Sequence, residues 1–379
     1  MHGFEDSNIY FDNAATTPLI PQQGNSLNPS CISARNSNNV IRQFANPSSP
    51  HILGLQAERT LGNARDGFAG LLNCKSNEIT FTSGGTEANN IAIIGSALAH
   101  RRQGISVFAD PWLHPSVLEP MRFVGEQDYL NIDKPAVKFF CLPFVNSETG
   151  DICNTSAEAE KIREANKNCK VIIFVDGVQG FCKEVPDLSG VDIFSFSAHK
   201  CHGASGVGGL FIRNGTKIQP LMFGGGQERG LRPGSENIEG IVSFLNIAEN
   251  LHSNIKANKA FVHDIYTIVE SIKNDLPDVF VNNLGENFSP YILNMSFLGV
   301  KGETLVHLLS ERGLHSSMGA ACRSRKNVKT ALEHMGFAPE RVASAVRFSF
   351  SVLNTIKEAE TARDIIVDSV KQLRRMLRM

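Results

Sequence analysis

The chain has 379 residues, of which 42% are hydrophobic and 20% charged, and its formal net charge at pH 7 is −1. Such a length allows a large core and about two domains, and the balanced charge gives no reason to expect nucleic acid or an acidic membrane surface as a partner. No apolar stretch approaches the ~18 residues that a membrane span requires. The polar start MHGFEDSNIYFDN lacks the apolar core of a signal peptide, so we expect a cytoplasmic protein.

The eight cysteines are scattered and form no CxxC pair. A zinc framework needs closely spaced ligand pairs, and disulfide scaffolds are typical of small secreted chains, so neither is expected, and we predict no metal site. Most of these thiols should be buried and behave as small hydrophobic groups.

The N-terminal part begins with a short predicted strand at Ile9–Phe11. Residues 19–50 are rich in Asn, Ser, Gln and Pro and read as loop, with room for a short helix near 40–44. Apolar residues then recur at helical spacing over 53–72, and 78–83 alternates as a strand.

Gly84-Gly85-Thr86 follows that strand and opens a long predicted helix. Free backbone N–H groups at a helix N-terminus make an anion-binding site. The glycines match neither a dinucleotide-binding nor a nucleotide-binding fingerprint, so these ligands are disfavoured. Because many helices open on such residues without binding anything, this signal is weak by itself.

The middle of the chain alternates strands and helices, which favours a mostly parallel α/β sheet. A capped helix is predicted near 156–166, and His114, Asp176 and Gln179 each follow a strand. The strands are predicted at 105–109, 137–144, 171–175, 191–196 and 209–213.

The strand at 191–196 leads into Ser197-Ala198-His199-Lys200 and a glycine-rich turn. Open α/β sheets place their ligand sites at such strand ends. A lysine flanked by polar groups suited to a phosphate is what a cofactor bonded through a lysine amine needs. An ordinary surface lysine after a strand is the alternative.

A long loop at 223–237 is basic, hydroxylated and expected to be mobile, and the C-terminal part begins later, around Lys256. Helices are predicted at 238–252 and 256–275, strands at 291–297 and 345–350, and a last amphipathic helix after Thr355, its expected cap.

The polar residues at the strand ends fit one ligand. A pyridinium nitrogen pairs with Asp, a ring hydroxyl with Gln, an aldehyde with Lys, and a phosphate with hydroxyls, His and helix amides. Pyridoxal phosphate combines these groups. The residues concerned are Gly85, Thr86, His114, Asp176, Gln179, Ser197, His199 and Lys200.

The chain resembles the cysteine desulfurases of the class V aminotransferase family, which are close to selenocysteine lyase. The resemblance implies fold type I, with a large α/β domain at 15–256 whose sheet is mostly parallel, and a small α+β domain made of 257–379 with 1–14. The motifs that carry it are DNAATTP (12–18), NPSSPH (46–51), FTSGGTEANN (81–90), DGVQ (176–179), SFSAHK (195–200), GGGQERGLRPGSEN (224–237), GAAC (319–322) and VRFS (346–349).

The resemblance implies that Lys200 holds pyridoxal phosphate and moves the α-proton of the substrate. Asp176 would pair with the ring nitrogen, Gln179 would contact the ring oxygen, and His114 would stack on the ring and act as acid and base. Phosphate contacts would come from Gly85, Thr86, Ser197 and His199, and from Ser235 of a neighbouring subunit, which implies a homodimer.

The resemblance also implies that Asn13 and Arg347 bind L-cysteine and that Cys322 accepts its sulfur. Residues Val346, Phe348 and Phe350 share one strand face, which leaves Arg347 on the other. Cys322 lies in a small, polar and basic segment whose cations would lower the thiol pKa from its usual ~8.5 and so raise the thiolate fraction. Cys201, beside Lys200, is expected to be a packing residue.

Three residues depart from the family pattern. Ser147 stands where an Asn usually contacts the cofactor's ring oxygen, Gly177 replaces the usual Ala after the aspartate, and Leu113 replaces a Glu before the histidine. We expect these changes to affect cofactor affinity and rate.

The expected function is conversion of L-cysteine to L-alanine, with sulfur passed to a persulfide and on to an acceptor protein for iron–sulfur clusters, thiolated cofactors or tRNA. The alternatives are a selenocysteine lyase, another class V pyridoxal enzyme such as an aminotransferase, which would not need Cys322, and a non-catalytic scaffold.

Overall fold

The computed structural model describes residues 8–20, 45–126, 136–318 and 330–376. Contacts divide the chain into two compact units. The large unit comprises 18–144 and 153–255, and the small unit comprises 1–17, 145–152 and 256–379.

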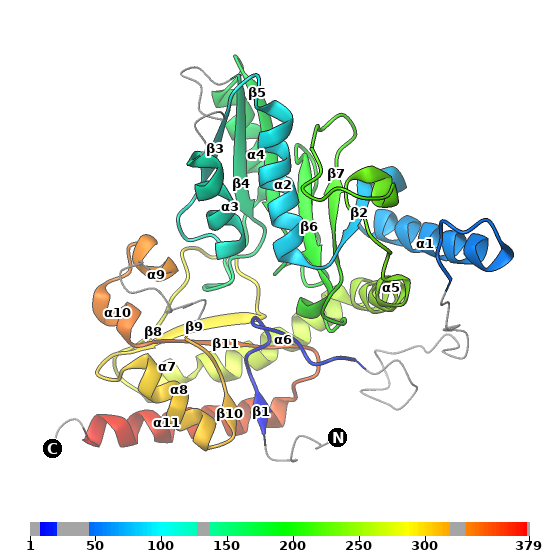
Figure 1. The fold of residues 1–379 in the computed structure, drawn as a ribbon. Coiled ribbons are helices and arrows are strands. Elements are labelled where there is room, and N and C mark those ends of the chain that lie inside the picture. The colour runs from blue at the N-terminus through cyan, green and yellow to red at the C-terminus, as the bar shows by residue number, and fades with distance from the viewer. Residues whose placement is uncertain (1–7, 21–44, 127–135, 319–329, 377–379) are drawn as a thin grey trace. The chain divides into compact units, whose positions relative to one another are not determined.

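The large unit is built on one six-stranded sheet with strand order β2-β7-β6-β5-β4-β3 (Figure 1). Neighbours from β3 to β6 are parallel, whereas β7 is antiparallel to both β6 and β2. The mostly parallel sheet predicted from the alternating pattern is therefore confirmed. The strands are β2 (Ile79–Thr82), β3 (Ile105–Ala109), β4 (Val137–Pro143), β5 (Lys170–Asp176), β6 (Ile193–Ser197) and β7 (Gly208–Ile212).

Helices cover both faces of this sheet. Ile193 and Phe196 of β6 point to opposite faces because side chains alternate along a strand. Ile193 joins a core cluster with Ile91 of α2, whereas Phe196 packs against Phe68 of α1, with ring centroids 5.4 Å apart. The helices are α1 (Ile52–Leu71), α2 (Gly85–His100), α3 (Pro115–Gly125), α4 (Thr155–Ala165) and α5 (Ile238–Ser253), with 3-10 turns η2 (Ser76–Glu78), η4 (Ala198–Lys200) and η5 (Gln227–Gly230).

The small unit holds a three-stranded antiparallel sheet of order β11-β9-β8 and a two-stranded parallel pair, β1 with β10. Phe297, Phe348 and Phe350 are fully buried in its core. Its strands are β1 (Ile9–Tyr10), β8 (Val279–Val281), β9 (Ile292–Phe297), β10 (Leu314–His315) and β11 (Ala345–Ser349). Its helices are α6 (Ile255–Glu270), α7 (Ile272–Asp275), α8 (Gly302–Glu311), α9 (Ala331–His334), α10 (Pro339–Ala343) and α11 (Ile356–Met376).

The segment 145–152 groups with the small unit, although the sequence places it inside the large domain. Val145 pairs with Ile152, and the Asp151 carboxylate accepts hydrogen bonds from the backbone N–H groups of Leu284 and Gly285 at 3.0 to 3.2 Å. These partners are distant in the sequence, so no local pattern indicates them.

Helix α3 has no counterpart in the sequence prediction. It opens on Pro115 and contains Pro120, and an interior proline removes a helical hydrogen bond and normally indicates a break. The predicted cap of α11 is confirmed, since Thr355 Oγ1 accepts from the backbone N–H of Glu358. The short helix expected near 40–44 lies outside the described residues. Among the helices that the structure describes, none is long and apolar enough to span a bilayer.

Candidate active site

The site of the large unit lies at the carboxyl ends of β5 and β6. Strand β5 ends at Asp176, and β6 ends at Ser197 and passes directly into the 3-10 turn that carries Lys200. Asp176 pairs with Ser195 in the parallel ladder. The register therefore brings together the two strand ends that the sequence analysis singled out.

A cradle for an anion lies at the start of α2. Gly84 precedes the helix with φ of 151°, and a Cβ there would lie 3.7 Å from Ser197 Oγ. Across the sheet a Cβ on Gly208 would lie 2.7 Å from the Gly84 Cα, so the close approach of these two backbones requires glycine. Ser197 Oγ is buried and has no hydrogen-bond partner among the described residues. Helix amides and an unsatisfied hydroxyl thus face the same place.

The Asp176 carboxylate is held by three donors. Its Oδ1 accepts from the backbone N–H of Val178 at 3.1 Å and from Ser195 Oγ at 3.4 Å, and its Oδ2 accepts from Asn89 Nδ2 at 3.1 Å. These bonds fix the direction of the carboxylate at the strand end. Gln179 is buried in the turn that follows.

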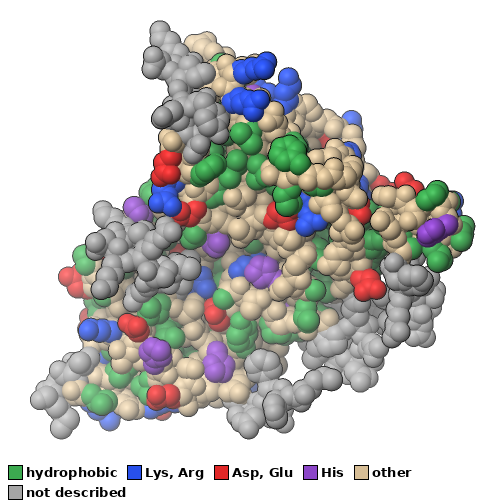
Figure 2. All heavy atoms as spheres, viewed as in Figure 1, with side chains coloured by type: hydrophobic (Ala, Val, Ile, Leu, Met, Phe, Trp, Pro, Cys, Tyr) green, Lys and Arg blue, Asp and Glu red, His purple; other side chains and the backbone are tan. Residues whose placement is uncertain are grey.

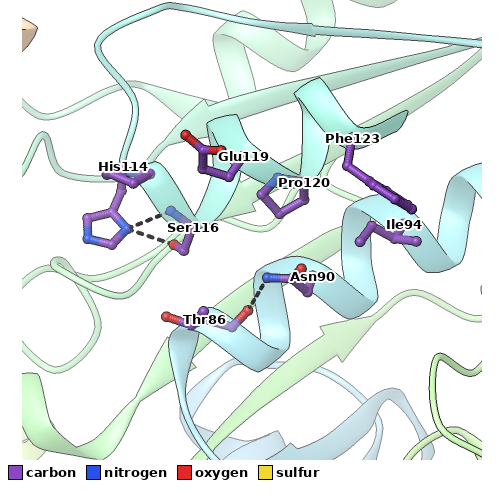
Figure 3. A pocket seen from close by; sticks show the side chains of 9 residues that line it. Thr86, Asn90, Ile94, His114, Ser116, Glu119, Pro120 and Phe123 are labelled. Carbon is purple, nitrogen blue, oxygen red and sulfur yellow. Dashed lines mark hydrogen bonds between the residues drawn. The ribbon is translucent and has the colours of Figure 1, made fainter. Parts of the chain in front are cut away.

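His114 caps α3 and is exposed. Its Nδ1 accepts from the backbone N–H of Ser116 at 3.1 Å and lies 2.7 Å from Ser116 Oγ (Figure 3). Asn89 Nδ2 donates to the same hydroxyl at 2.8 Å. Asn89 and Ser116 were not predicted from the sequence. Two features could have indicated them: Ser116 follows a proline that opens a helix, and Asn89 belongs to the motif FTSGGTEANN.

The turn after β6 is electropositive. Partial burial, followed by Lys200, Lys183 and His114, lowers the pKa of His199 to about 4. His199 is therefore a neutral imidazole near pH 7, while the lysine charges that depress its pKa favour an anion nearby. Cys201 is buried, and its thiol donates to the carbonyl oxygens of Ser197 and Ala198, both at 3.4 Å, which suits the expected packing role.

An open pocket extends from His114 and Thr86 along the neighbouring helices α2 and α3 (Figure 3). Ile94, Pro120 and Phe123 supply an apolar wall. In the space-filling view, hydrophobic side chains gather over these two helices (Figure 2). The exposed side of His114 thus borders a groove rather than a flat surface.

The loop at 223–237 is anchored at its centre by side-chain contacts. Glu228 forms a bidentate ion pair with Arg65 at 2.7 and 2.8 Å and accepts from the backbone N–H of Phe81. Glu228 and Arg229 both adopt left-handed backbone angles, with φ of 48° and 59°, a strained state that tertiary contacts must hold. Ser235, farther along, is exposed.

The small unit holds the residues expected to bind substrate. Arg347 is buried on β11 and donates to the Ser147 carbonyl at 2.8 Å and to Asp12 Oδ1 at 3.2 Å, with Glu148 Oε1 at 3.8 Å. Its Nε is buried without a hydrogen-bond partner in the described chain. The predicted division of strand faces is confirmed, because Val346 and Phe348 are fully buried in the core.

Asn13 lies close to the same strand, donating from Nδ2 to the Ser349 carbonyl at 2.9 Å. Ser317 exchanges two backbone hydrogen bonds with Arg347, at 2.7 and 3.1 Å. Ser317, five residues before Cys322 in the sequence, therefore lies beside Arg347 of β11. Cys322 itself lies outside the described residues.

Gly177 has a steric explanation. A Cβ at this position would lie 2.0 Å from the ring of Phe194, so the usual alanine cannot coexist with that phenylalanine without movement. Leu113 is buried, and Ser147 uses its backbone carbonyl to hold Arg347.

The arrangement of the large unit fits pyridoxal phosphate. The oriented carboxylate of Asp176 suits a pyridinium nitrogen, and the unsatisfied Ser197 hydroxyl beside the α2 N-terminus suits a phosphate. Lys200, whose amine is predicted to bond such a cofactor, follows Ser197 within one turn.

Comparison with known proteins gives the same family. The aminotransferase class-V model matches residues 9–141 and 132–361. The chain is 35% identical to the NifS/IcsS protein homolog of Lactobacillus delbrueckii subsp. bulgaricus, over 93% of this chain and 94% of that protein. It is 31% identical to cysteine desulfurase IscS of Dictyoglomus turgidum, over 97% and 95%.

A solved structure titled NifS-like protein superposes with a TM-score of 0.80 and 27% identity, covering 98% of this chain and 99% of that one. Likeness in sequence and in fold thus extends over nearly the whole length of the chain. The chain therefore belongs to the aminotransferase class-V family and, within it, to the pyridoxal-phosphate-dependent cysteine desulfurases.

Proposed function

We propose that this protein takes sulfur from L-cysteine onto Cys322 and releases L-alanine, with pyridoxal phosphate held on Lys200. The observation that carries the proposal is the strand-end cluster of the large unit. There the oriented Asp176 carboxylate and the buried, unsatisfied Ser197 hydroxyl flank the turn that bears Lys200.

The residues that would hold the cofactor divide by its chemical groups. Asp176 would pair with the ring nitrogen, Gln179 would contact the ring oxygen, and Lys200 would bond the aldehyde carbon. When bound, the cofactor supplies an electron sink for the electrons left behind when the substrate loses its α-proton. The phosphate would be held by Gly85, Thr86, Ser197, His199 and, from the neighbouring subunit, Ser235.

Different side chains then bind the substrate, move its protons and accept its sulfur. Arg347 and Asn13 bind the cysteine: its carboxylate can accept from the unsatisfied Arg347 Nε–H, and its ammonium group can donate to the unsatisfied Asn13 Oδ1. The Lys200 amine removes the α-proton, and His114 exchanges a proton through Nε2. The Cys322 thiolate attacks the substrate sulfur; the S–S bond forms as the C–S bond breaks, and the electron pair stays with carbon.

A persulfide on Cys322 needs an acceptor. We propose an acceptor protein that passes the sulfur to iron–sulfur clusters or to thiolated cofactors or tRNA, a homodimer as the working form, and the cytoplasm as its location. The names of the IscS relatives support the transfer of sulfur to iron–sulfur clusters.

The decisive experiment compares Cys322→Ser with Cys201→Ser, a matched change at a thiol that is packed in the core. Cys322→Ser should keep the yellow colour of the bound cofactor yet form almost no alanine from L-cysteine, whereas Cys201→Ser should retain most activity. Mass spectrometry of wild-type protein after turnover without reductant should find one added sulfur on the Cys322 peptide. Sulfur on Cys201, or normal turnover by Cys322→Ser, would remove this mechanism.

Assays with selenocysteine distinguish a cysteine desulfurase from a selenocysteine lyase. Selenium can be expelled without a protein thiol, so a selenocysteine lyase should keep its activity toward selenocysteine in Cys322→Ser. A cysteine desulfurase acting through Cys322 should prefer L-cysteine in the wild type, and Cys322→Ser should lose that activity first.

A further inference from the structure

Asn89 is a fully buried amide that joins two residues of the site. Its Nδ2 lies 2.8 Å from Ser116 Oγ and 3.1 Å from Asp176 Oδ2. An amide nitrogen carries two hydrogens, so each partner receives one. The reverse orientation would place the amide oxygen against the Asp176 carboxylate, where both groups accept. Asp176 therefore determines which way the amide points.

The other end of this side chain makes no compensating bond. Asn89 Oδ1 is buried and has no hydrogen-bond partner among the described residues. Leaving a buried acceptor unsatisfied destabilises a fold, and an apolar residue of similar volume would avoid that cost. The two hydrogen bonds that the Asn89 amide donates therefore explain best why a polar side chain stands at this buried position.

Ser116 passes the connection on to His114. Its hydroxyl accepts from Asn89, so its own hydrogen is available for His114 Nδ1 at 2.7 Å. The backbone N–H of Ser116 also points at Nδ1, from 3.1 Å. With two donors directed at Nδ1, the neutral ring carries its hydrogen on Nε2, the nitrogen on the far side of the ring from Ser116 (Figure 3).

We propose that Asn89 and Ser116 are positioning residues that tie His114 to Asp176 in one hydrogen-bonded relay and keep the hydrogen of the neutral His114 ring on Nε2. The inference rests on the proposed function, in which Asp176 meets the ring nitrogen of the cofactor and His114 exchanges a proton. A single buried amide then orients both the carboxylate and, through one hydroxyl, the imidazole.

The first test uses the holoenzyme and three variants. Asn89→Leu removes both donors at similar volume, Ser116→Ala removes only the hydroxyl, and Ser116→Thr restores it. We expect kcat for alanine formation to fall about tenfold or more in Asn89→Leu and about tenfold in Ser116→Ala, with KM for L-cysteine within about threefold of wild type. Ser116→Thr should recover most of the lost kcat.

The visible spectrum distinguishes the two ends of the relay. Asn89→Leu should shift the absorption band of the bound cofactor, because Asp176 loses one of its three donors. Ser116→Ala should leave the band in place, because Asp176 keeps all three. In the double variant the loss of kcat should stay within about twofold of that in Asn89→Leu alone, since both changes cut one path.

A readout independent of turnover is the imidazole nitrogen NMR spectrum of protein labelled with nitrogen-15 histidine, with His114→Gln to assign the signal. Wild type should show His114 with hydrogen on Nε2 and an acceptor at Nδ1, and Ser116→Ala should weaken this preference. If wild type shows hydrogen on Nδ1, or if the kcat losses of the single variants multiply in the double variant, the relay is wrong. If instead wild type forms no alanine while the Nε2–H form is seen, the proposed function fails and the relay stands.

Discussion

At the scale of single residues, the chain places polar groups by giving them several partners at once. Asp176 has three donors, and Arg347 contacts one carbonyl and two carboxylates in addition to its unsatisfied Nε. Multiple partners restrict the rotamers of a side chain and so keep it oriented before any ligand arrives.

Arg347→Lys should raise KM for L-cysteine by about tenfold or more, because a lysine cannot reproduce the planar fork that pairs with a carboxylate. Cofactor absorption should not change, since the proposed cofactor contacts lie on other side chains. Steady-state kinetics together with the visible spectrum test this. An unaltered KM would exclude Arg347 from carboxylate binding.

The buried side chain of His202 should make the free energy of unfolding depend on pH. Burial lowers its pKa to about 4, below the ~6.5 of an exposed histidine, although the Pro18 carbonyl opposes the shift. Above pH ~6.5 neither the folded nor the unfolded state binds a proton at this site. Between pH ~6.5 and ~4 only the unfolded state does, so the free energy of unfolding should fall by about 2 kcal/mol from pH 7 to pH 5 on account of this residue.

His202→Asn is the matched variant, since asparagine tolerates the left-handed backbone of this position, where φ is 64°, and can still donate to Pro18. Urea unfolding at pH 7 and pH 5 should show a smaller pH dependence in His202→Asn. An identical pH dependence in the two proteins would assign the effect to other groups.

At the scale of elements, loops and turns owe their conformation to contacts from elsewhere in the chain. The centre of the loop at 223–237 stays left-handed at two non-glycine residues because Arg65 and the backbone of β2 bind Glu228. Arg232 adds an ion pair with Glu87, next to Thr86 in the first turn of α2. The loop that carries Ser235 is thus attached to the same helix start that forms the anion cradle.

Glu228→Gln should lower the free energy of unfolding by about 3 kcal/mol, because Arg65 would keep a largely buried charge without its counter-charge. Glu158→Gln is the control, since Glu158 pairs with Lys161 on the exposed surface of α4 and its loss should change stability little. Denaturant titration of both variants measures the difference. Equal, small effects would show that the buried pair does not hold the loop.

At the scale of the whole molecule, the large unit carries the proposed cofactor residues, and the small unit carries Asn13, Arg347 and the backbone beside which the Cys322 segment begins. Ser235 belongs to the large unit but is proposed to serve the cofactor of a second subunit. The homodimer is therefore part of the proposed chemistry.

Light scattering should give a mass twice the 41.4 kDa of one chain. Ser235→Ala should keep that mass and weaken cofactor affinity by at most about tenfold, the effect of one hydrogen bond. A monomer with full cofactor affinity would contradict both the dimer and the role of Ser235.

Local pattern in the sequence was enough to predict most strands and helices of the large unit, including β5 and β6, and the capped start of α11 in the small unit. It did not predict α3, nor α8, α9, α10, β8 and β10 of the small unit. The spacing of apolar residues along a helix or a strand depends only on residues that are near one another in the sequence. It can therefore be read from one sequence without knowledge of the fold. The motifs at the strand ends likewise predicted that Asp176, Ser197 and Lys200 are cofactor residues, because parallel strands bring their carboxyl ends to one edge.

Only the tertiary structure decided which distant groups meet. Asn89 reaches Asp176 and Ser116 across 87 and 27 residues of sequence, Phe194 occupies the space that forces glycine at 177, and the turn at 145–152 joins the small unit through Asp151. Such contacts depend on how whole elements pack, and packing is set by the combined shape of many side chains rather than by any local period.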